Sequence, residues 1–554
     1  MAQKEAWGSR VGLILAMAGN AVGLGNFLRF PVQAIQNGGG AFIIPYLVCF
    51  LLMGIPLLWI EWSTGRFGGK RGHHSTPFIL NSLDPKRRFW KYFGVFGIFT
   101  NIAVASYYCF IESWTMSYVM HSIAGTFEGM NQTEVANFFA RYVDVMKSTT
   151  GIPYEAVLFF LLCLILNTSI LSRGLHGVEK VAKIGMPLLI LFGIILAVRG
   201  LTLGDSGASI EHPTASAIDG LNFLWTPQFD SLLNLKVWLA AAGQVFFTLS
   251  LGMGSIQCYA SYIESKDDIA LNAASAGFMN EFVEVVLGSS IVIPIAAGYL
   301  GIDWVIENAG FGMAFQTMPY LFNNWGPVLA AFAGVMWFGL LFFAGITSSL
   351  AMGTPWMGFM RDEFGWSQKK GAWSFGIIVM ILGLPTVLFF NQGVFDEYDY
   401  WAGTVSLVVF ALAESILFAW VFGMGKGWKE INEGGDIKVP SIYKFIIKYI
   451  TPVLLLCVFL GALFTPLNND WVSAFNNLFS GNGWQLDNSS LILYASNAGL
   501  KEQIAAATDP NIISTLEEKM FYVTLARFIL LGLFLAISAL VYKAYRRRVS
   551  ENTI

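Results

Sequence analysis

A polar, glycine-rich run from Gly19 to Pro31 interrupts the first long apolar stretch of the chain. It contains three glycines, two asparagines and one arginine. Backbone N–H and C=O groups that leave a helix inside hydrocarbon need other partners, so such a break is tolerated where it lines a cavity. Exposed carbonyls suit alkali cations, and the N–H groups of a half-helix suit a carboxylate. The run therefore predicts a site for a small zwitterion and a cation.

A second run, from Gly243 to Ser255, interrupts the sixth apolar stretch with glycine and hydroxyl residues. The first and sixth stretches are five helices apart, and we expect them to cross the membrane in opposite directions. An inverted repeat of five plus five helices predicts this pattern, with the ligand held where the two breaks face each other. The alternative is that the glycines only permit close helix packing, which explains one break more easily than two matching ones.

The elements that carry these breaks are predicted membrane spans. The 554 residues are 55% hydrophobic and 12% charged, with a mean hydropathy of +0.59, which excludes an ordinary soluble protein. We therefore predict an all-α integral membrane protein with twelve transmembrane helices. They are expected near 9–34, 40–66, 88–121, 155–171, 178–200, 236–262, 269–298, 327–361, 369–389, 394–423, 442–465 and 518–545.

The charged residues indicate the orientation of these spans. Basic residues crowd the loop from Arg66 to Lys91 and close the chain at Arg546–Arg548, whereas the loops after spans three, five, seven and nine are mostly acidic. Basic loops stay in the cytoplasm, so we predict a multi-pass protein of the cell (inner or plasma) membrane with both termini cytoplasmic. Its partners are predicted to be the lipid bilayer, a small-molecule substrate and ions, with no nucleic acid.

Histidine and cysteine are placed where they cannot build a catalytic centre. All five cysteines fall within apolar spans, and all five histidines lie in loops or at span ends. Neither a disulfide framework nor a metal spacing is predicted, and an intramembrane hydrolase would lack a base beside its nucleophile. We therefore predict that the protein is not an enzyme. Two classes of protein then remain, a transporter and a non-transporting membrane sensor. We expect the transporter, because we recognise no soluble signalling domain of the kind a sensor would use.

Four runs in this sequence resemble the neurotransmitter:sodium symporter family, close to its bacterial leucine transporters. They are Gly19–Pro31, Phe246–Gly254, Phe343–Ser349 and Asp399–Thr404, and the similarity extends from about Trp7 to the eleventh span. The resemblance implies the LeuT-like fold in one domain, 1–554. Its inverted repeats would be 1–200 and 236–423, followed by two additional helices in 442–545 with a long polar extracellular loop near 466–519. A homodimer is compatible with the family.

The resemblance also implies sodium-coupled import of neutral hydrophobic L-amino acids, aliphatic or aromatic, by alternating access, with two sodium sites. The first would take oxygens of Ala21, Asn26, Thr248 and Asn280. The second would take carbonyls of Gly19, Val22 and Ala344 and hydroxyls of Thr347 and Ser348. Cages of neutral oxygens suit a monovalent cation better than Ca²⁺ or Mg²⁺. The alternative for Thr347 and Ser348 is hydrogen bonding to the carbonyl four residues earlier.

The implied substrate site uses the same two breaks. The N–H groups of Leu24 and Gly25 and the Tyr108 hydroxyl would bind the carboxylate. The ammonium would meet carbonyls of Ala21, Phe247 and Thr248 and the Ser250 hydroxyl. The substrate side chain would contact Val104, Tyr108, Phe247, Met253, Ser348 and Met352. This lining excludes charged side chains, because a buried unpaired charge costs several kcal/mol.

Charged residues on either side of this site resemble the gates of the family. Arg29 and Asp399 would close the outer side, with Phe247 as a lid. Lys4, Trp7, Ser261, Tyr262 and Asp362 would form the inner network. Lys4 stands where the family usually has arginine, so a bidentate pair with Asp362 is lost. Lys4 is alternatively only a positive-inside residue.

Glu284 lies four residues after Asn280, so the two share a helix face directed at the first sodium site. Chloride-dependent animal members of the family have serine at the matching position. A fixed carboxylate in place of a mobile anion predicts chloride-independent transport, and its protonation on the empty return step predicts proton antiport. The alternative is a neutral glutamic acid that only ties spans together.

Overall fold

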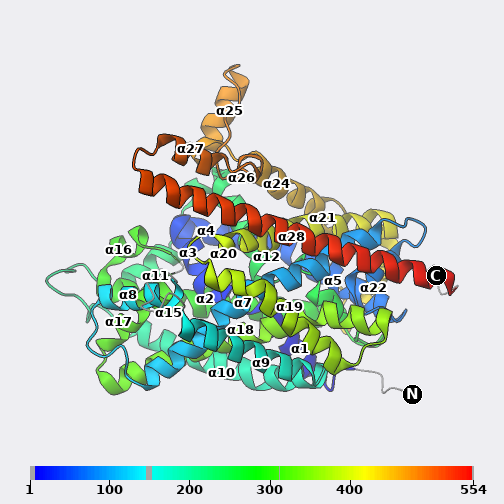
Figure 1. Cartoon of the computed structure of the whole chain (residues 1–554), viewed down its shortest axis with the longest axis horizontal. Coiled ribbons are helices and arrows are strands. Elements are labelled where there is room, and N and C mark those ends of the chain that lie inside the picture. Colours follow the sequence, from blue (N-terminus) through cyan, green and yellow to red (C-terminus); the bar gives the residue numbers. More distant parts are fainter. Residues whose placement is uncertain (1–5, 145–152, 311, 552–554) are drawn as a thin grey trace.

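The computed structural model describes residues 6–144, 153–310 and 312–551. Within these ranges the chain folds into a bundle of helices (Figure 1). The β-structure found there is one isolated β-bridge between Pro466 and Leu486. The predicted all-α membrane fold is confirmed. Low charge and long apolar runs produce it, because a helix satisfies every backbone hydrogen bond within its own segment.

Ten helices of the described residues are long and apolar enough to span a bilayer. Those formed by one helix are Trp90–Ile123 (α7), Tyr154–Leu171 (α9), Leu175–Leu201 (α10), Pro327–Phe364 (α18), Gln368–Leu388 (α19) and Pro510–Ser550 (α28). The others contain more than one helical segment. Gly40–Gly69 contains α4 (Gly40–Cys49) and α5 (Ile55–Gly69); Ile269–Leu300 contains α14 (Ile269–Glu281) and α15 (Ser289–Leu300); Val394–Asn432 contains α20 (Val394–Tyr398), α21 (Ser406–Ile416) and α22 (Met424–Asn432); Ile442–Leu463 contains α23 (Ile442–Phe445) and α24 (Thr451–Leu463). Shorter helices connect them: Thr76–Leu83 (α6), Gln132–Val143 (α8), Ala217–Trp225 (α11), Ile302–Glu307 (α16), Met318–Asn323 (α17), Trp471–Phe479 (α25), Leu491–Ala495 (α26) and Ala498–Ala506 (α27).

Two further spans are broken, as the sequence predicts. The first consists of Arg10–Ala21 (α1), followed after a bend of 47° by Gly25–Leu28 (α2) and Phe30–Gln36 (α3). The sixth consists of Leu235–Thr248 (α12) and Ser255–Ala260 (α13). Between α12 and α13 the backbone takes positive φ at Ser250 (53°), Gly252 (69°) and Gly254 (86°), which ends the helix. In the described residues, ten helices and the bent first span are therefore long and apolar enough to cross a membrane, whereas α12 alone is shorter than a full span, so the prediction of twelve is not fully matched.

The central helix of the bundle is α7, which is buried along most of its length and packs against α18, α6, α9 and α19. It carries Val104, Tyr107 and Tyr108 past the two breaks. Two other site-bearing segments are π-helical, Phe282–Gly288 between α14 and α15, and Asp399–Val405 between α20 and α21. Such wide turns are frequent at functional sites, and these two hold Glu284 and Asp399.

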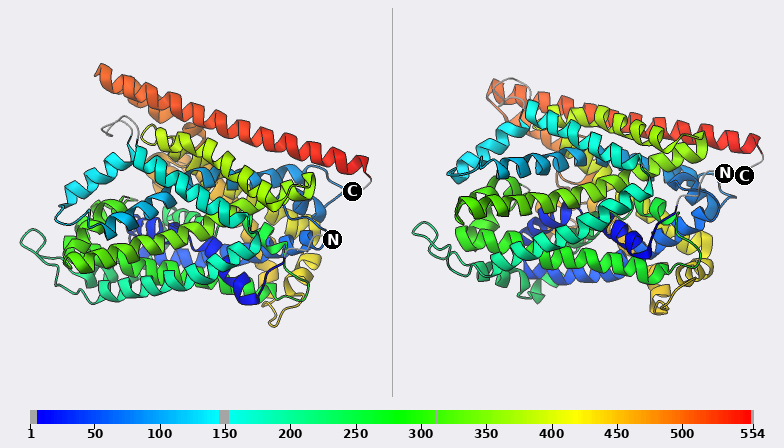
Figure 2. Two further views of the ribbon diagram at one scale, coloured as in Figure 1. Left: turned by 60° about the horizontal axis from the view of Figure 1, so that its bottom comes forward. Right: turned by 90° about the horizontal axis from the view of Figure 1, so that it is seen from below.

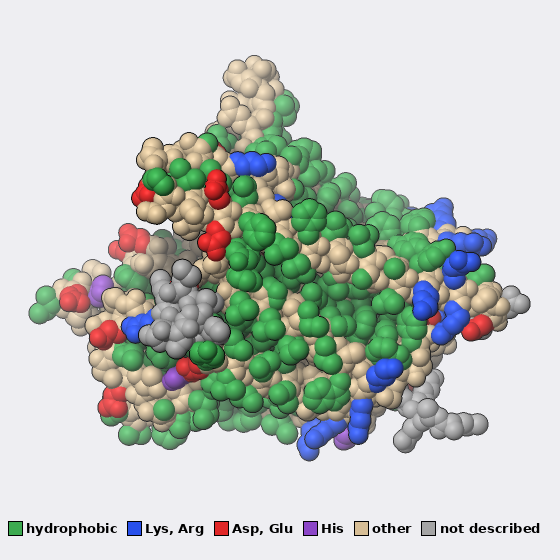
Figure 3. All heavy atoms as spheres, viewed as in Figure 1, with side chains coloured by type: hydrophobic (Ala, Val, Ile, Leu, Met, Phe, Trp, Pro, Cys, Tyr) green, Lys and Arg blue, Asp and Glu red, His purple; other side chains and the backbone are tan. Residues whose placement is uncertain are grey.

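The two ends of the bundle differ in charge. The start of α1 and the end of α28 lie at the same end (Figures 1 and 2). Lys and Arg side chains gather at that end, acidic side chains gather at the opposite end, and an apolar band lies between them (Figure 3). At the acidic end, the segment expected as a polar loop near 466–519 contains α25, α26 and α27, and α28 begins at Pro510.

Candidate functional site

The break after α1 redirects backbone groups to side chains. The N–H of Gly23 donates to Asn26 Oδ1 (2.8 Å), and the N–H of Leu24 donates to the Tyr108 hydroxyl (2.9 Å). In an unbroken helix these N–H groups would bond the carbonyls of Gly19 and Asn20. Those two carbonyls are thereby released, as the sequence analysis requires for a cation site.

The second break lies directly against the first. The Ser250 hydroxyl donates to the Asn20 carbonyl (2.9 Å), and Ser255 Oγ lies 3.3 Å from Asn20 Oδ1. The turn between α12 and α13 is also fixed by the Gly252 N–H, which donates to Glu61 (2.7 Å), and by Asn101, which donates to the Met253 carbonyl (2.6 Å). The structure therefore brings the two broken spans together, as predicted.

Residues predicted for the first sodium site form one buried network. Asn26 Nδ2 donates to Asn280 Oδ1 (2.8 Å), and Asn280 Nδ2 donates to the Thr248 hydroxyl (3.0 Å). Thr248 in turn donates to Glu284, and Ala21 lies 5% exposed at the end of α1. The exposed fraction of Asn26, Asn280 and Glu284 is 0%, so the network is sealed from solvent.

Glu284 faces this network, as its spacing from Asn280 predicts. It also accepts from Gln244 on α12 and from the Tyr46 hydroxyl on α4 (2.7 Å), and the same hydroxyl lies 3.1 Å from Glu281. A tyrosine hydroxyl has one hydrogen, so full bonds to both carboxyl groups require a proton on one of them. The side chains of Tyr46, Gln244 and Glu281, which are not among the predicted site residues, therefore surround Glu284.

The second predicted sodium site joins α1 to α18. The Ser348 hydroxyl is 3.2 Å from the carbonyl of Gly19 and 3.2 Å from that of Ala344. The Thr347 hydroxyl donates to the Phe343 carbonyl, four residues earlier (2.8 Å). A Cβ on Gly19 would lie 2.9 Å from Thr347 Cβ, so only glycine permits this approach. Val22 is fully buried beside it. Both hydroxyls therefore show the alternative bond to the carbonyl four residues earlier, and Ser348 in addition contacts α1 at the Gly19 carbonyl.

Some of the predicted substrate residues line a small cavity of about 130 Å³, whereas Ala21, Val104, Thr248, Ser250, Met253, Ser348 and Met352 are not among its lining residues. Leu24, Gly25, Tyr108 and Phe247 line it, and it extends to Arg29 and Asp399. A Cβ on Gly25 would lie 2.5 Å from the Phe247 ring, so the backbone of the break is in contact with this ring. Val104, Met253 and Met352, predicted to meet the substrate side chain, are buried at 2%, 6% and 2% exposure.

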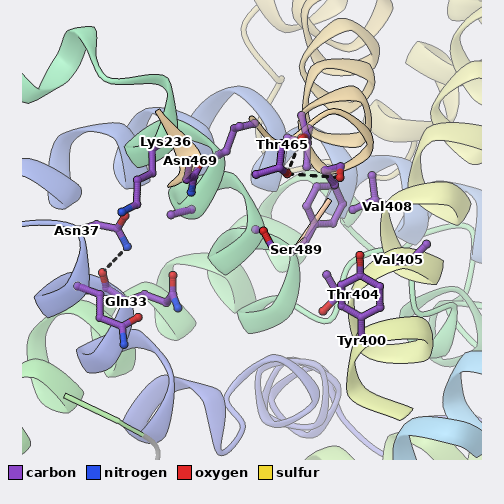
Figure 4. Close-up of a pocket in the computed structure, with 18 of the residues that line it drawn as sticks. Gln33, Asn37, Lys236, Tyr400, Thr404, Val405, Val408, Thr465, Asn469 and Ser489 are labelled. Carbon is purple, nitrogen blue, oxygen red and sulfur yellow. Dashed lines mark hydrogen bonds between the residues drawn. The ribbon is translucent and has the colours of Figure 1, made fainter. Parts of the chain in front are cut away.

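The outer gate residues are held by aromatic rings. The Arg29 guanidinium lies 4.2 Å from the centroid of Phe247, and the Tyr107 hydroxyl donates to Asp399 (2.6 Å). Arg29 also lines a larger vestibule of about 740 Å³ between α3, α12, α21 and α24. Figure 4 shows its polar rim, which includes Gln33, Lys236 and Thr404. The small cavity thus meets the vestibule at Arg29.

The inner network is centred on His74, which is not among the predicted gate residues. The backbone N–H of His74 donates to Asp362 (2.7 Å), and ring atom Nδ1 of His74 lies 2.8 Å from the Ser261 hydroxyl. Its ring stacks on that of Tyr262, with centroids 4.4 Å apart. Arg361 donates to the Tyr262 hydroxyl (2.6 Å) and contacts Asp362 (3.3 Å).

Trp7 seals the same side by donating to the Tyr259 carbonyl (3.2 Å). Lys4 lies outside the described residues. Arg361 therefore supplies a cation beside Asp362, and its position next to Asp362 in the sequence could have indicated this.

Comparison with known proteins gives a consistent result. The sequence pattern of the sodium:neurotransmitter symporter family matches residues 4–132 and 124–501. An uncharacterized sodium-dependent transporter of Methanocaldococcus jannaschii is 30% identical over 468 residues, which cover 82% of this chain and 90% of that protein. Sodium-dependent nutrient amino acid transporter 1 of Drosophila melanogaster is 25% identical over 525 residues, which cover 84% of this chain and 78% of that protein.

A solved structure shares the fold. MhsT in complex with L-phenylalanine superposes with a TM-score of 0.72 at 29% identity, covering 83% of this chain and 100% of MhsT.

Proposed function

Because this chain belongs to the sodium:neurotransmitter symporter family, a family of sodium-dependent transporters rather than enzymes, we propose that it couples Na⁺ entry to the import of a neutral, hydrophobic L-amino acid. Import proceeds by alternating access, with the outer and inner networks opening in turn. The observation that carries the proposal is the contact between the two helix breaks, together with the cavity that Leu24, Gly25 and Phe247 of these breaks line.

The breaks present opposite polarity to a zwitterion. At the start of α2, the Leu24 and Gly25 N–H groups and the Tyr108 hydroxyl bind the carboxylate. On the other side, carbonyls of Ala21, Phe247 and Thr248 and the Ser250 hydroxyl bind the ammonium. Half-helix N–H groups favour negative charge, and unwound carbonyls favour positive charge. In the structure the Leu24 N–H donates to the Tyr108 hydroxyl, so it turns from that oxygen to the carboxylate when the substrate binds.

Two sodium ions travel as co-substrates. The first is held by Ala21, Asn26, Thr248 and Asn280, and the second by Gly19, Val22, Ala344, Thr347 and Ser348. The hydrogen bonds that join Asn26, Asn280 and Thr248 show that their polar atoms converge on one buried point. A cation there replaces hydrogen bonds with ion–dipole contacts, and the substrate carboxylate completes its shell. Sodium and substrate therefore bind cooperatively.

The side-chain subsite selects large apolar substrates. Met253 and Met352 are unbranched and adapt their shape to the ligand, and no charged residue is among the predicted lining. The structural relative MhsT has L-phenylalanine bound, and the insect relative is named as a nutrient amino acid transporter. Both support an amino-acid substrate, and the phenylalanine bound to MhsT supports an aromatic side chain.

Glu284 supplies the negative charge that a buried sodium favours, so transport needs no chloride. Its carboxyl group shares the Tyr46 hydroxyl with Glu281, and this geometry accommodates a proton when the sodium has left. Return of the empty carrier with that proton gives proton antiport. The positive charge at one end of the bundle supports a cytoplasmic position for both termini of a cell-membrane protein.

A thermal-shift screen of purified protein tests ligand and ion linkage together. We expect apolar amino acids to raise the melting temperature in Na⁺ and to leave it unchanged in K⁺. Counterflow of labelled amino acid in proteoliposomes then separates a transporter from a sensor. Binding without counterflow, or an equal thermal shift in both ions, would overturn the proposal.

A further inference from the structure

Helix α25 (Trp471–Phe479) presents an apolar face that is largely exposed. Val472, Phe475, Leu478 and Phe479 are exposed at 64%, 40%, 48% and 84%. Their spacing places them on one side of the helix, and the polar residues Ser473, Asn476 and Asn477 lie on the opposite side. A narrow apolar stripe opposite a polar one is typical of a helix that lies in a membrane interface.

The position of α25 relative to the spans fits such an interface. It follows α24 after a short connection and projects sideways from the bundle, roughly across the direction of α7 and α28 (Figure 1). The outward side of α24 is itself apolar, with Val453, Leu456, Leu460 and Phe464 exposed at 41–55%. Lipid must cover this side of a membrane span, and so it reaches the base of α25. Figure 3 shows apolar side chains along one side of the projection, above the apolar surface of the bundle.

The charges around α25 set its depth. No charged residue occurs between Trp471 and Leu486, whereas Asp470 and Asp487 flank this segment. Hydrogen bonds from Ser473 lower the pKa of Asp470, and those from Ser489 lower the pKa of Asp487. Both carboxylates therefore stay ionised in water and mark the aqueous side of the segment.

The partly exposed Trp484 lies beside the apolar face of α25, next to the buried Trp471. The rings of Trp471 and Trp484 lie 5.9 Å apart, and Phe475 packs 5.4 Å from Trp484. Tryptophan concentrates at the level of the lipid headgroups, where an apolar ring and a polar N–H are both accommodated.

We propose that α25 lies in the lipid headgroup region of the leaflet at the acidic end of the bundle, with Val472, Phe475, Leu478 and Phe479 inserted toward the acyl chains. The segment is uncharged, so it binds the neutral interfacial region of phosphatidylcholine without requiring anionic lipid. A second copy of the chain is a poorer occupant, because a stable protein interface uses about 20–30 residues on each side. The exposed face of α25 offers four.

Site-directed spin labelling in phosphatidylcholine proteoliposomes tests this proposal. In a Cys457→Ala background, which removes the exposed native thiol, Phe479→Cys carries a nitroxide on the apolar face. Val472→Cys is a second reporter on that face, and Asn477→Cys is the matched control on the polar face. Each label is assayed for collisions with apolar oxygen and with a water-soluble nickel chelate.

We expect the oxygen-to-nickel collision ratio at 472 and 479 to exceed that at 477 severalfold, in low and high salt alike. Equal ratios at the three positions would show that the face is in water and would overturn the proposal. Dipolar coupling between nitroxides at 479 of two copies at close range would also overturn it, because a second copy would then cover the face.

Discussion

Replacing Tyr108 with phenylalanine removes one oxygen atom from the proposed carboxylate site. In the structure this hydroxyl accepts the Leu24 N–H at 2.9 Å and is buried, at 5% exposure of the residue. In the bound state it is proposed to donate to the substrate carboxylate. A hydrogen bond to a charged group contributes about 1.5–3 kcal/mol, so Tyr108→Phe should weaken substrate binding about 10- to 150-fold.

The assay is equilibrium binding of labelled phenylalanine to purified protein at several Na⁺ concentrations. Since the carboxylate is proposed to complete the first sodium shell, the apparent Na⁺ affinity should fall together with substrate affinity. Tyr118→Phe is the matched control. It is the same change on the same helix, at a buried hydroxyl for which the described residues provide no hydrogen-bond partner. Equal affinities for the Tyr108 and Tyr118 variants would refute the assigned carboxylate site.

Three further outcomes are expected. Wild-type uptake proceeds in chloride-free gluconate. Glu284→Ser removes the negative charge beside the bound sodium, which costs about 3 kcal/mol and slows uptake about 100-fold until chloride is added. A serine variant whose uptake does not depend on chloride would contradict the role of Glu284. In competition assays, methionine, leucine, phenylalanine, tyrosine and tryptophan displace the labelled amino acid at least as well as alanine or glycine do. If glycine competes better than all of them, the side-chain subsite is not the apolar one proposed. Burial, together with the charges of Arg548 and Arg71, lowers the pKa of His73 from 6.5 to about 4. The unfolded chain therefore takes up a proton that the folded one does not, so stability falls as pH falls from 6.5 to about 4, and His73→Gln should flatten this dependence in thermal unfolding.

The two helix breaks could be predicted because their cause is local. Glycine and asparagine inside an apolar stretch leave backbone groups without helix partners, and the structure shows the Gly23 and Leu24 N–H groups bonded to side chains instead. The direction of Glu284 followed from helical spacing in the same way. Boundaries were less well defined, since α28 begins at Pro510, before the predicted residue 518.

Contacts between distant spans could not be predicted from single-residue patterns. Tyr46 and Gln244 reach Glu284 from α4 and α12, and nothing in their own neighbourhoods distinguishes them from other buried polar residues. His74 lies in a loop, where its role at the inner network depends on α18 packing beside it. The apolar face of α25 was hidden by the asparagines and serines around it, because composition averages over both faces of a short helix.

Sodium-driven accumulation of labelled phenylalanine in proteoliposomes tests whether the two facing breaks form a coupled transport site. With chloride absent on both sides, an inward Na⁺ gradient should drive uptake above equilibrium, and an outward-directed proton gradient should increase it. Replacing Na⁺ with K⁺ should abolish it. Accumulation that is the same in K⁺ as in Na⁺, or that requires chloride, would contradict this mechanism.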